Sequence, residues 1–151
     1  MRNRKPMTVE ELKQFIYAGK SGFVMTNTKT GASREYLVVQ SRDKKRWYVC
    51  KQFVGYIGTL FAGPGANVLM WSPNSKVSQL SEEFTTFTWL MKQLWEKAAL
   101  PETLHVTHNG NCGRCGRKLT DDKSVELGYG PHCWKMLSKD IDFWPRVVGE
   151  K

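Results

Sequence analysis

The chain has 151 residues and a formal net charge of +9 at pH 7. That length suffices for one compact domain with its own hydrophobic core, and the charge favours a polyanionic partner. No apolar run approaches the roughly 18 residues that span a bilayer, and residues 1–15 lack the apolar stretch of a secretory signal. Four cysteines, three of them at metal-site spacing, are typical of a reducing cytoplasm.

Residues 1–20 are predicted to form a basic arm followed by a short amphipathic helix. Thr8 and Glu11 have the spacing of a capping box, in which each side chain bonds to a backbone N–H of the first turn. Gly19 suits the end of this helix. We expect the helix to pack on a sheet through one apolar face, which consists of Val9, Leu12, Phe15 and Ile16.

Residues 21–104 are predicted to form an antiparallel sheet and a second amphipathic helix. Short segments rich in aromatic and β-branched residues lie at residues 23–28, 34–40, 47–54, 56–61 and 68–71. Their short connections favour sequential antiparallel pairing. The expected fold class is α+β, with a five-stranded antiparallel meander or a small partly open barrel flanked by helices. Cys50 lies within the third segment and is interpreted as a buried structural thiol.

The second helix is predicted to begin at Ser81 and to end before Pro101. Trp89 falls outside the apolar face of this helix, on its polar side. Two interpretations are open: the C-terminal module covers the ring, or Trp89 anchors an interface with a partner or a second copy of the chain. The apolar face itself consists of Phe84, Phe87, Met91, Leu94, Trp95 and Ala98.

Residues 105–151 are predicted to form a metal-binding module and an apolar tail. Cys112 and Cys115 form a Cys-x-x-Cys step, in which the neighbouring glycines permit a tight turn. Cys133 follows Gly130 and Pro131, a pair typical of a helix start. The three thiols predict one structural zinc ion in a treble-clef-like or zinc-ribbon-like module. The tail at residues 141–148 is expected to fold back onto the core, with a docking peptide as the alternative.

A structural zinc site takes four nitrogen or sulfur ligands, so a histidine is expected beside the three cysteines. His108 is the preferred candidate because it lies just ahead of the Cys-x-x-Cys step. His132 is the main alternative. It adjoins Cys133, however, and neighbouring residues on a helix point about 100° apart, so binding of both to one ion is awkward.

Several segments resemble one family of proteins. The sequences CGRCGRKLT (residues 112–120) and SVELGYGPHC (124–133), together with FVMTNTKTG (23–31), WYV (47–49) and YIGTL (56–60), are similar to small, uncharacterised proteins of bacteriophages and prophages. The likeness covers roughly residues 20–137. It implies a phage setting and a zinc site made by Cys112, Cys115, Cys133 and His108, but no reaction.

Two groups of basic residues are candidate contacts for nucleic acid. Residues 21–77 hold eight basic and two acidic side chains, so the positive charge is concentrated there. Within that region, Trp47 and Tyr48 directly follow the basic residues of one turn, which is how small β-sheets hold single strands. The candidate residues are Arg42, Lys44, Lys45 and Arg46 in that turn and Arg114, Arg117 and Lys118 at the Cys-x-x-Cys step.

The favoured function is that of a non-catalytic nucleic-acid-binding accessory protein in the cytoplasm of an infected bacterium. The alternative is a protein-binding inhibitor or modulator of a host enzyme or antiphage defence complex, to which Trp89 and the apolar tail would contribute. An enzyme is disfavoured because residues 1–104 contain no histidine and their acidic residues are scattered, so no catalytic residue is assigned.

Overall fold

The structure, a computed structural model, describes residues 5–63 and 66–139. Its elements run in the order α1 (Val9–Ile16), β1 (Lys20–Asn27), β2 (Ser33–Gln40), β3 (Arg46–Lys51), β4 (Gly55–Phe61), α2 (Glu82–Glu96), β5 (Leu104–His108), α3 (Asp122–Leu127) and α4 (Pro131–Lys139). The expected basic arm and apolar tail fall largely on residues 1–4 and 140–151, which lie outside the described residues. No helix in the described part is both long and apolar enough to cross a bilayer.

The five strands form one antiparallel sheet in the order β4-β3-β2-β1-β5. The expected α+β class is confirmed, and the sheet is open rather than closed into a barrel. Strands β1 to β4 are the predicted meander, joined by short connections. Strand β5 returns from the C-terminal part of the chain and pairs with β1, so that Phe23 lies opposite His108 and Met25 opposite Val106.

Two details of the predicted strands are wrong. Residues 68–71 do not form the fifth strand: Met70 makes only an isolated bridge with Thr59. The third strand ends at Lys51 rather than at residue 54, because Phe53 turns into the left-handed region with φ of 68°. The true fifth strand is short and has only two apolar residues, Leu104 and Val106, and the strand with which it pairs, β1, is distant in sequence.

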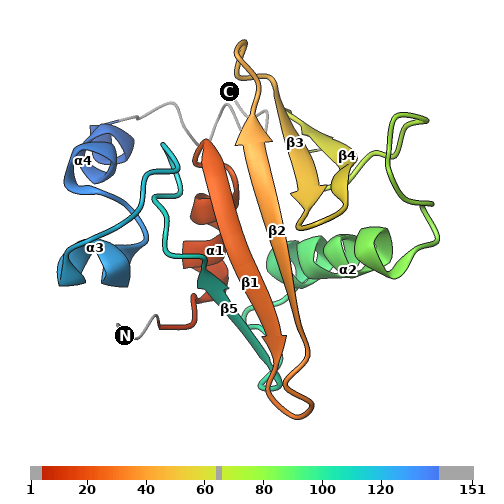
Figure 1. Ribbon diagram of the computed structural model, residues 1–151, viewed down its shortest axis with the longest axis horizontal. Coiled ribbons are helices and arrows are strands. Elements are labelled where there is room, and N and C mark those ends of the chain that lie inside the picture. The colour runs from red at the N-terminus through yellow and green to blue at the C-terminus, as the bar shows by residue number, and fades with distance from the viewer. Residues whose placement is uncertain (1–4, 64–65, 140–151) are drawn as a thin grey trace.

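Helices α1 and α2 lie on one face of the sheet, behind β1 and β2 in the view of Figure 1. The capping box of α1 is present, with Glu11 N–H bonded to Thr8 Oγ1 and Thr8 N–H to Glu11 Oε1. Helix α2 is capped by Ser81, as predicted. The core between helices and sheet is rich in aromatic residues, and its largest fully buried side chains include Trp47, Tyr17, Tyr36, Phe15, Phe23 and Phe87.

The C-terminal module follows β5 directly and packs on the end of α1. The ring of Phe15 lies 5.7 Å from that of Tyr129 and 6.3 Å from that of His108, between centroids. The backbone N–H of Lys20 donates to the carbonyl of Gly113 at 2.8 Å. The module is therefore attached to the start of β1 as well as through β5. The opposite face of the sheet is covered by neither α1 nor α2 (Figure 1).

Candidate metal centre and the open face of the sheet

Three cysteines of the C-terminal module gather at one point. The sulfur atoms of Cys112, Cys115 and Cys133 all lie within 4.8 Å of one another. Cys112 and Cys133 are buried, whereas Cys115 is exposed. Zinc binds thiolates at about 2.3 Å in tetrahedral geometry, which requires sulfur atoms packed at this spacing. The three side chains therefore fit a metal ion, and among the described residues they are the one such cluster of His, Cys, Asp and Glu.

Local backbone geometry brings the first two cysteines together. The N–H of Cys112 donates to the carbonyl of Arg117 at 2.7 Å, and the N–H of Gly116 donates to the carbonyl of Cys112 at 2.8 Å. This closes the chain into the tight knuckle predicted from the Cys-x-x-Cys step. Gly113 also has no room for a side chain, since a Cβ there would lie 2.4 Å from the ring of Phe15. Cys133 is the third residue of α4, as its position after Pro131 predicted.

Electrostatics in the cluster favour a cation. Burial acts to raise the pKa of the Cys112 thiol, but hydrogen bonds from the backbone N–H groups of Gly130, Cys115 and Arg114 lower it below its usual value. The pKa of Cys133 rises to about 11 because burial and the neighbouring thiols outweigh the lowering effect of Arg114. Deprotonation of Cys112 is therefore favoured, whereas deprotonation of Cys133 beside it is opposed. A divalent metal removes this repulsion, since it binds the deprotonated thiols.

His108 does not lie in the cluster, contrary to the prediction. It is only 3 % exposed, and both of its ring nitrogens bond to backbone groups. Nδ1 accepts from the N–H of Gly110 at 3.0 Å, and Nε2 donates to the carbonyl of Val125 at 2.5 Å. His108 therefore ties β5 to the start of the knuckle and to α3. Its position ahead of Cys112 in the sequence gave no information on where the ring points.

A hollow of about 480 Å³ opens beside the three thiols. His132 and Asp121 are the histidine and the carboxylate that line it, in addition to the cysteines. His132 is exposed in the first turn of α4. Asp121 is engaged already, because its Oδ2 accepts from the N–H of Ser124 and caps α3. His132 is thus the described histidine closest to the role that His108 was predicted to have.

The comparisons with known proteins bear on this module alone. Residues 102–138 match DUF6011, a family of unknown function. The match begins just before β5 and ends within α4, so it spans the three cysteines and the elements that hold them. It agrees with the resemblance to an uncharacterised family. No curated protein and no solved structure is significantly similar to the chain.

The predicted nucleic-acid contacts in the β2–β3 turn are only partly accessible. Arg42, Lys44, Lys45 and Arg46 are all exposed. Trp47, in contrast, is fully buried, and its Nε1 donates to the carbonyl of Tyr17 at 3.2 Å. The prediction that its ring contacts nucleic acid is wrong, because the side chain points towards the helices. Successive side chains of a strand point to opposite faces, so Tyr48 lies on the other side of the sheet, where it is 37 % exposed.

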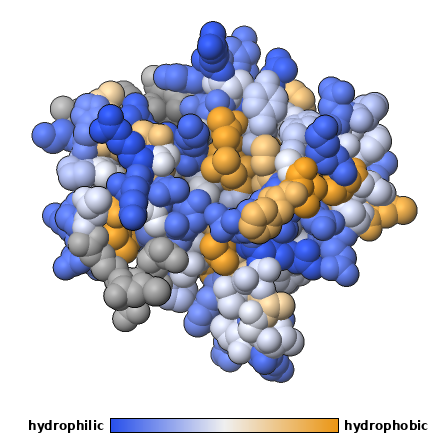
Figure 2. Space-filling view, viewed as in Figure 1, coloured by the Kyte–Doolittle hydropathy of each residue, from blue (hydrophilic) through white to orange (hydrophobic). Residues whose placement is uncertain are grey.

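Further exposed aromatic rings that sequence reasoning did not select belong to the same part of the sheet. Phe61 lies opposite Arg46 in the β3–β4 pair, and the guanidinium stands 5.9 Å from the ring centroid. Phe53, in the β3–β4 turn, is 97 % exposed and has a left-handed φ. Such a backbone conformation costs on the order of 1–3 kcal/mol for a residue other than glycine. Figure 2 shows hydrophobic side chains gathered across this face among hydrophilic ones.

The basic residues of the knuckle adjoin this face. Gly116 lies against Lys20 at the start of β1, so closely that a Cβ on Gly116 would be 2.8 Å from Cδ of the lysine. Arg117 and Lys118 are exposed. Arg114 is half-buried and donates from Nη1 to Cys133 Sγ at 3.6 Å, so its charge serves the cysteine cluster first.

Trp89 is 40 % exposed on α2. It lines a groove with Met25 and Leu104, at the ends of β1 and β5. Of the described residues that line this groove, none belongs to the cysteine module after β5. The interpretation that this module covers the ring finds no support there, whereas the interface interpretation stays a prediction.

Proposed function

We propose that the protein is a small phage-encoded accessory protein that binds single-stranded nucleic acid without catalysing a reaction, in the cytoplasm of the infected bacterium. A zinc ion held by Cys112, Cys115 and Cys133 stabilises its C-terminal module. The proposal rests on one observation: exposed aromatic rings on the open side of the sheet lie next to exposed basic side chains. Single strands are bound in this way, with bases stacked on rings and phosphates near cations.

The acidic residue within the β2–β3 turn leaves the basic ones available. Asp43 is occupied by the turn itself: its Oδ1 accepts from Ser41 Oγ at 2.5 Å and from the N–H of Lys45 at 2.9 Å. The hydrogen bond from Ser41, followed by that from Lys45, lowers the pKa of the Asp43 carboxyl. The carboxylate therefore fixes the turn, while the neighbouring cations project from it. No ion pair joins Arg42, Lys44 or Lys45 to another of the described residues.

The ion is proposed to be zinc because three thiolates are soft ligands, which zinc accepts in tetrahedral sites. His132 is the proposed fourth ligand, since it lines the hollow beside the thiols. When bound, the ion would neutralise the thiolates and fix the knuckle against α4. The ligand residues take no part in contacts with nucleic acid in this proposal, and Arg117 and Lys118 extend the basic surface beyond the sheet.

Binding to a host protein is the second candidate function, and Trp89 favours it. Tryptophan is more frequent at protein interfaces than on the rest of the protein surface. The ring of Trp89 is 40 % exposed. The ring lies on α2, behind the sheet, so a partner there would leave the open face accessible. The two functions therefore occupy different surfaces and are separable by mutation.

Salt dependence of binding tests the proposed function. The zinc-loaded full chain is titrated into fluorescein-labelled single strands and matched duplexes of DNA and RNA, at several salt concentrations. Each phosphate contact with a single strand contributes about 0.7 to the slope of log affinity against log salt. Replacing Lys44, Lys45 and Arg46 by alanine should therefore lower the slope by about 2.

The control variant removes the same charge elsewhere, by alanine at Lys29, Lys92 and Lys97, which are also exposed. It should leave the slope unchanged. Absence of binding to all four probes at low salt would refute the proposal, as would an equal loss of slope in the two triple variants.

A further inference from the structure

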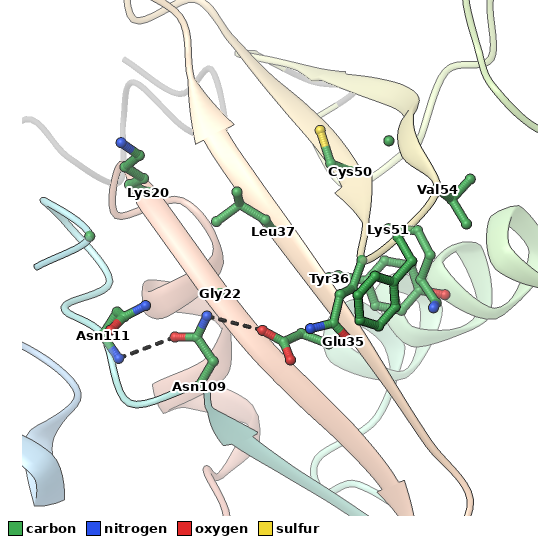
Figure 3. A pocket seen from close by; sticks show the side chains of 14 residues that line it. Lys20, Gly22, Glu35, Tyr36, Leu37, Cys50, Lys51, Val54, Asn109 and Asn111 are labelled. Carbon is green, nitrogen blue, oxygen red and sulfur yellow. Dashed lines mark hydrogen bonds between the residues drawn. The ribbon is translucent and has the colours of Figure 1, made fainter. Parts of the chain in front are cut away.

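The open face of the sheet contains a hollow of about 490 Å³ between β1, β2, the β3–β4 turn and the knuckle. Its floor is formed where Gly22, Leu37 and Cys50 pair across three strands. Gly22 has no side chain, and the side-chain amide of Asn109 occupies the space directly above it. Lys20 and Glu35 lie at opposite ends of this floor, as Figure 3 shows.

The carboxylate of Glu35 is held facing the hollow. Its Oε2 accepts from Asn109 Nδ2 at 3.2 Å, and Asn109 Oδ1 in turn accepts from the backbone N–H of Asn111 at 3.2 Å. Both hydrogen bonds are drawn in Figure 3. Neither Oε1 of Glu35 nor the side-chain amide of Asn111 bonds to another of the described residues. The hollow therefore contains a carboxylate held by a hydrogen bond and, from Asn111, a side-chain amide in its lining, both with free hydrogen-bonding capacity.

An acidic group is unexpected on this surface. Residues 21–77 contain only two acids, Glu35 and Asp43, against eight basic residues. Asp43 is used by its own turn, whereas Glu35 lies among Lys20 and Lys51 in the hollow. A carboxylate repels phosphate, so it would weaken a surface that bound only a backbone. It can, however, accept hydrogen bonds from the N–H groups of a base.

The distances along the strands fit one nucleotide. Glu35 pairs with Val24, which is four residues from Lys20 on β1, and residues four apart on a strand are separated by about 13 Å. A base directed at Glu35 would therefore leave its phosphate towards Lys20. Phe53 also lines the hollow, and its exposed ring offers a surface on which a base can stack.

We propose, on the basis of the proposed function, that this hollow binds one unpaired guanine of a single-stranded nucleic acid. Among the common bases, guanine alone presents two adjacent N–H donors, N1–H and N2–H, on its Watson–Crick edge. These match the two oxygens of a carboxylate. The neighbouring O6 of guanine is an acceptor, for which the free amide of Asn111 supplies N–H groups. Phe53 stacks on the base, and Lys20 and Lys51 neutralise the flanking phosphates.

Anisotropy titrations with labelled nonamers test this inference. One probe is a run of thymidines, and the others carry a single guanine, adenine or cytosine at the centre; RNA versions in a uridine background distinguish the two sugars. The zinc-loaded full chain should bind the guanine probe at least about tenfold more tightly than the others, as for one good bidentate contact. Glu35→Gln should abolish this preference while the thymidine probe binds at least as well as before.

Glu96→Gln is the matched control, because Glu96 is exposed on α2, behind the sheet. It should retain the preference for guanine. Phe53→Ala should weaken binding of every probe, whereas Leu80→Ala, which removes another highly exposed apolar side chain, should not. Equal affinity of the wild-type chain for all four bases would overturn the guanine site and leave the proposed function intact. Absence of binding to any probe would overturn both.

Discussion

The side-chain amide of Asn109 lies directly over Gly22 of β1, where a Cβ atom would come within 2.1 Å of Asn109 Nδ2. The same amide donates to Glu35 on β2. The glycine thus makes room for a polar contact between the sheet and the segment that leads into the cysteine knuckle.

Gly22→Ala should therefore destabilise the protein, because the new methyl group displaces Asn109 from a crowded position. Overpacking of this kind costs about 1–3 kcal/mol. The same substitution in an Asn109→Ala background should cost less, since the clashing amide is gone. Chemical denaturation of the four proteins in this double-mutant cycle measures the coupling. Equal costs of Gly22→Ala in both backgrounds would show that Asn109 is not the group displaced.

The cysteine cluster should bind about one zinc ion per chain. Cys112→Ser and Cys133→Ser should each abolish zinc binding and lower the melting temperature. Cys50→Ser should still bind the ion and melt at the wild-type temperature, because Cys50 lies on β3, outside the cluster. Metal analysis of the purified proteins, before and after chelation, gives the readout. Loss of zinc in the Cys50 variant would contradict the proposed ligand set.

The two candidate histidines should behave in opposite ways. His132→Ala should weaken zinc affinity at least about tenfold. Even residues that only hydrogen-bond to a metal ligand lower the affinity by about 10–100-fold when they are replaced. Its melting temperature in excess zinc should change little, since the side chain is exposed. His108→Ala should keep the ion but unfold more easily, because it loses two hydrogen bonds to buried backbone. Competition with a chromophoric chelator measures the affinities. Retention of full affinity by the His132 variant would remove it from the site.

Trp47 and Tyr48 are adjacent in sequence but should have separate effects. Trp47→Ala removes a fully buried ring and should cost about 3–5 kcal/mol of unfolding free energy. Tyr48→Ala should leave the fold nearly unchanged and weaken binding to single strands by about 1–3 kcal/mol, the value of one stacked base. Thermal melting and anisotropy titration on the same samples separate the two. A stable Tyr48 variant with unaltered affinity would exclude this ring from the binding surface.

Trp89→Ala should leave an almost equally stable monomer that no longer associates with a partner or with itself. The reason is that the ring is partly exposed in a groove, so its removal opens no closed cavity. Sedimentation velocity over a range of concentrations detects self-association, and thermal melting is measured alongside. A strong loss of stability with unchanged association would contradict the interface.

Local sequence signals predicted much of this fold. Thr8 and Ser81 marked the starts of α1 and α2 because capping depends on residues within one turn. Four strands followed from alternation. Strand β5 was missed because its only strand partner is β1, and nothing in a segment of five residues specifies a contact with a strand some 80 residues earlier.

The candidate metal centre and binding surface were also predictable only in part. Cysteine spacing identified the three thiols, since the Cys-x-x-Cys step constrains its own backbone. His108 was misassigned because sequence distance does not report where a ring points. Phe53 was missed because it lies within the predicted strand at residues 47–54, and only the left-handed φ reveals the turn that exposes the ring.

The late position of β5 has a consequence for synthesis on the ribosome. Strand β1 is made early, but its outer edge has no partner until residues 104–108 have been added. The 47 residues from Phe61 to His108 (108 − 61 = 47) take roughly 2–9 s to translate. During that interval the nascent meander exposes a row of unpaired N–H and C=O groups, which is where another chain could add a strand. The strand that completes the sheet also leads directly into the cysteine knuckle, so the nascent chain protects its own edge only when the module is about to form.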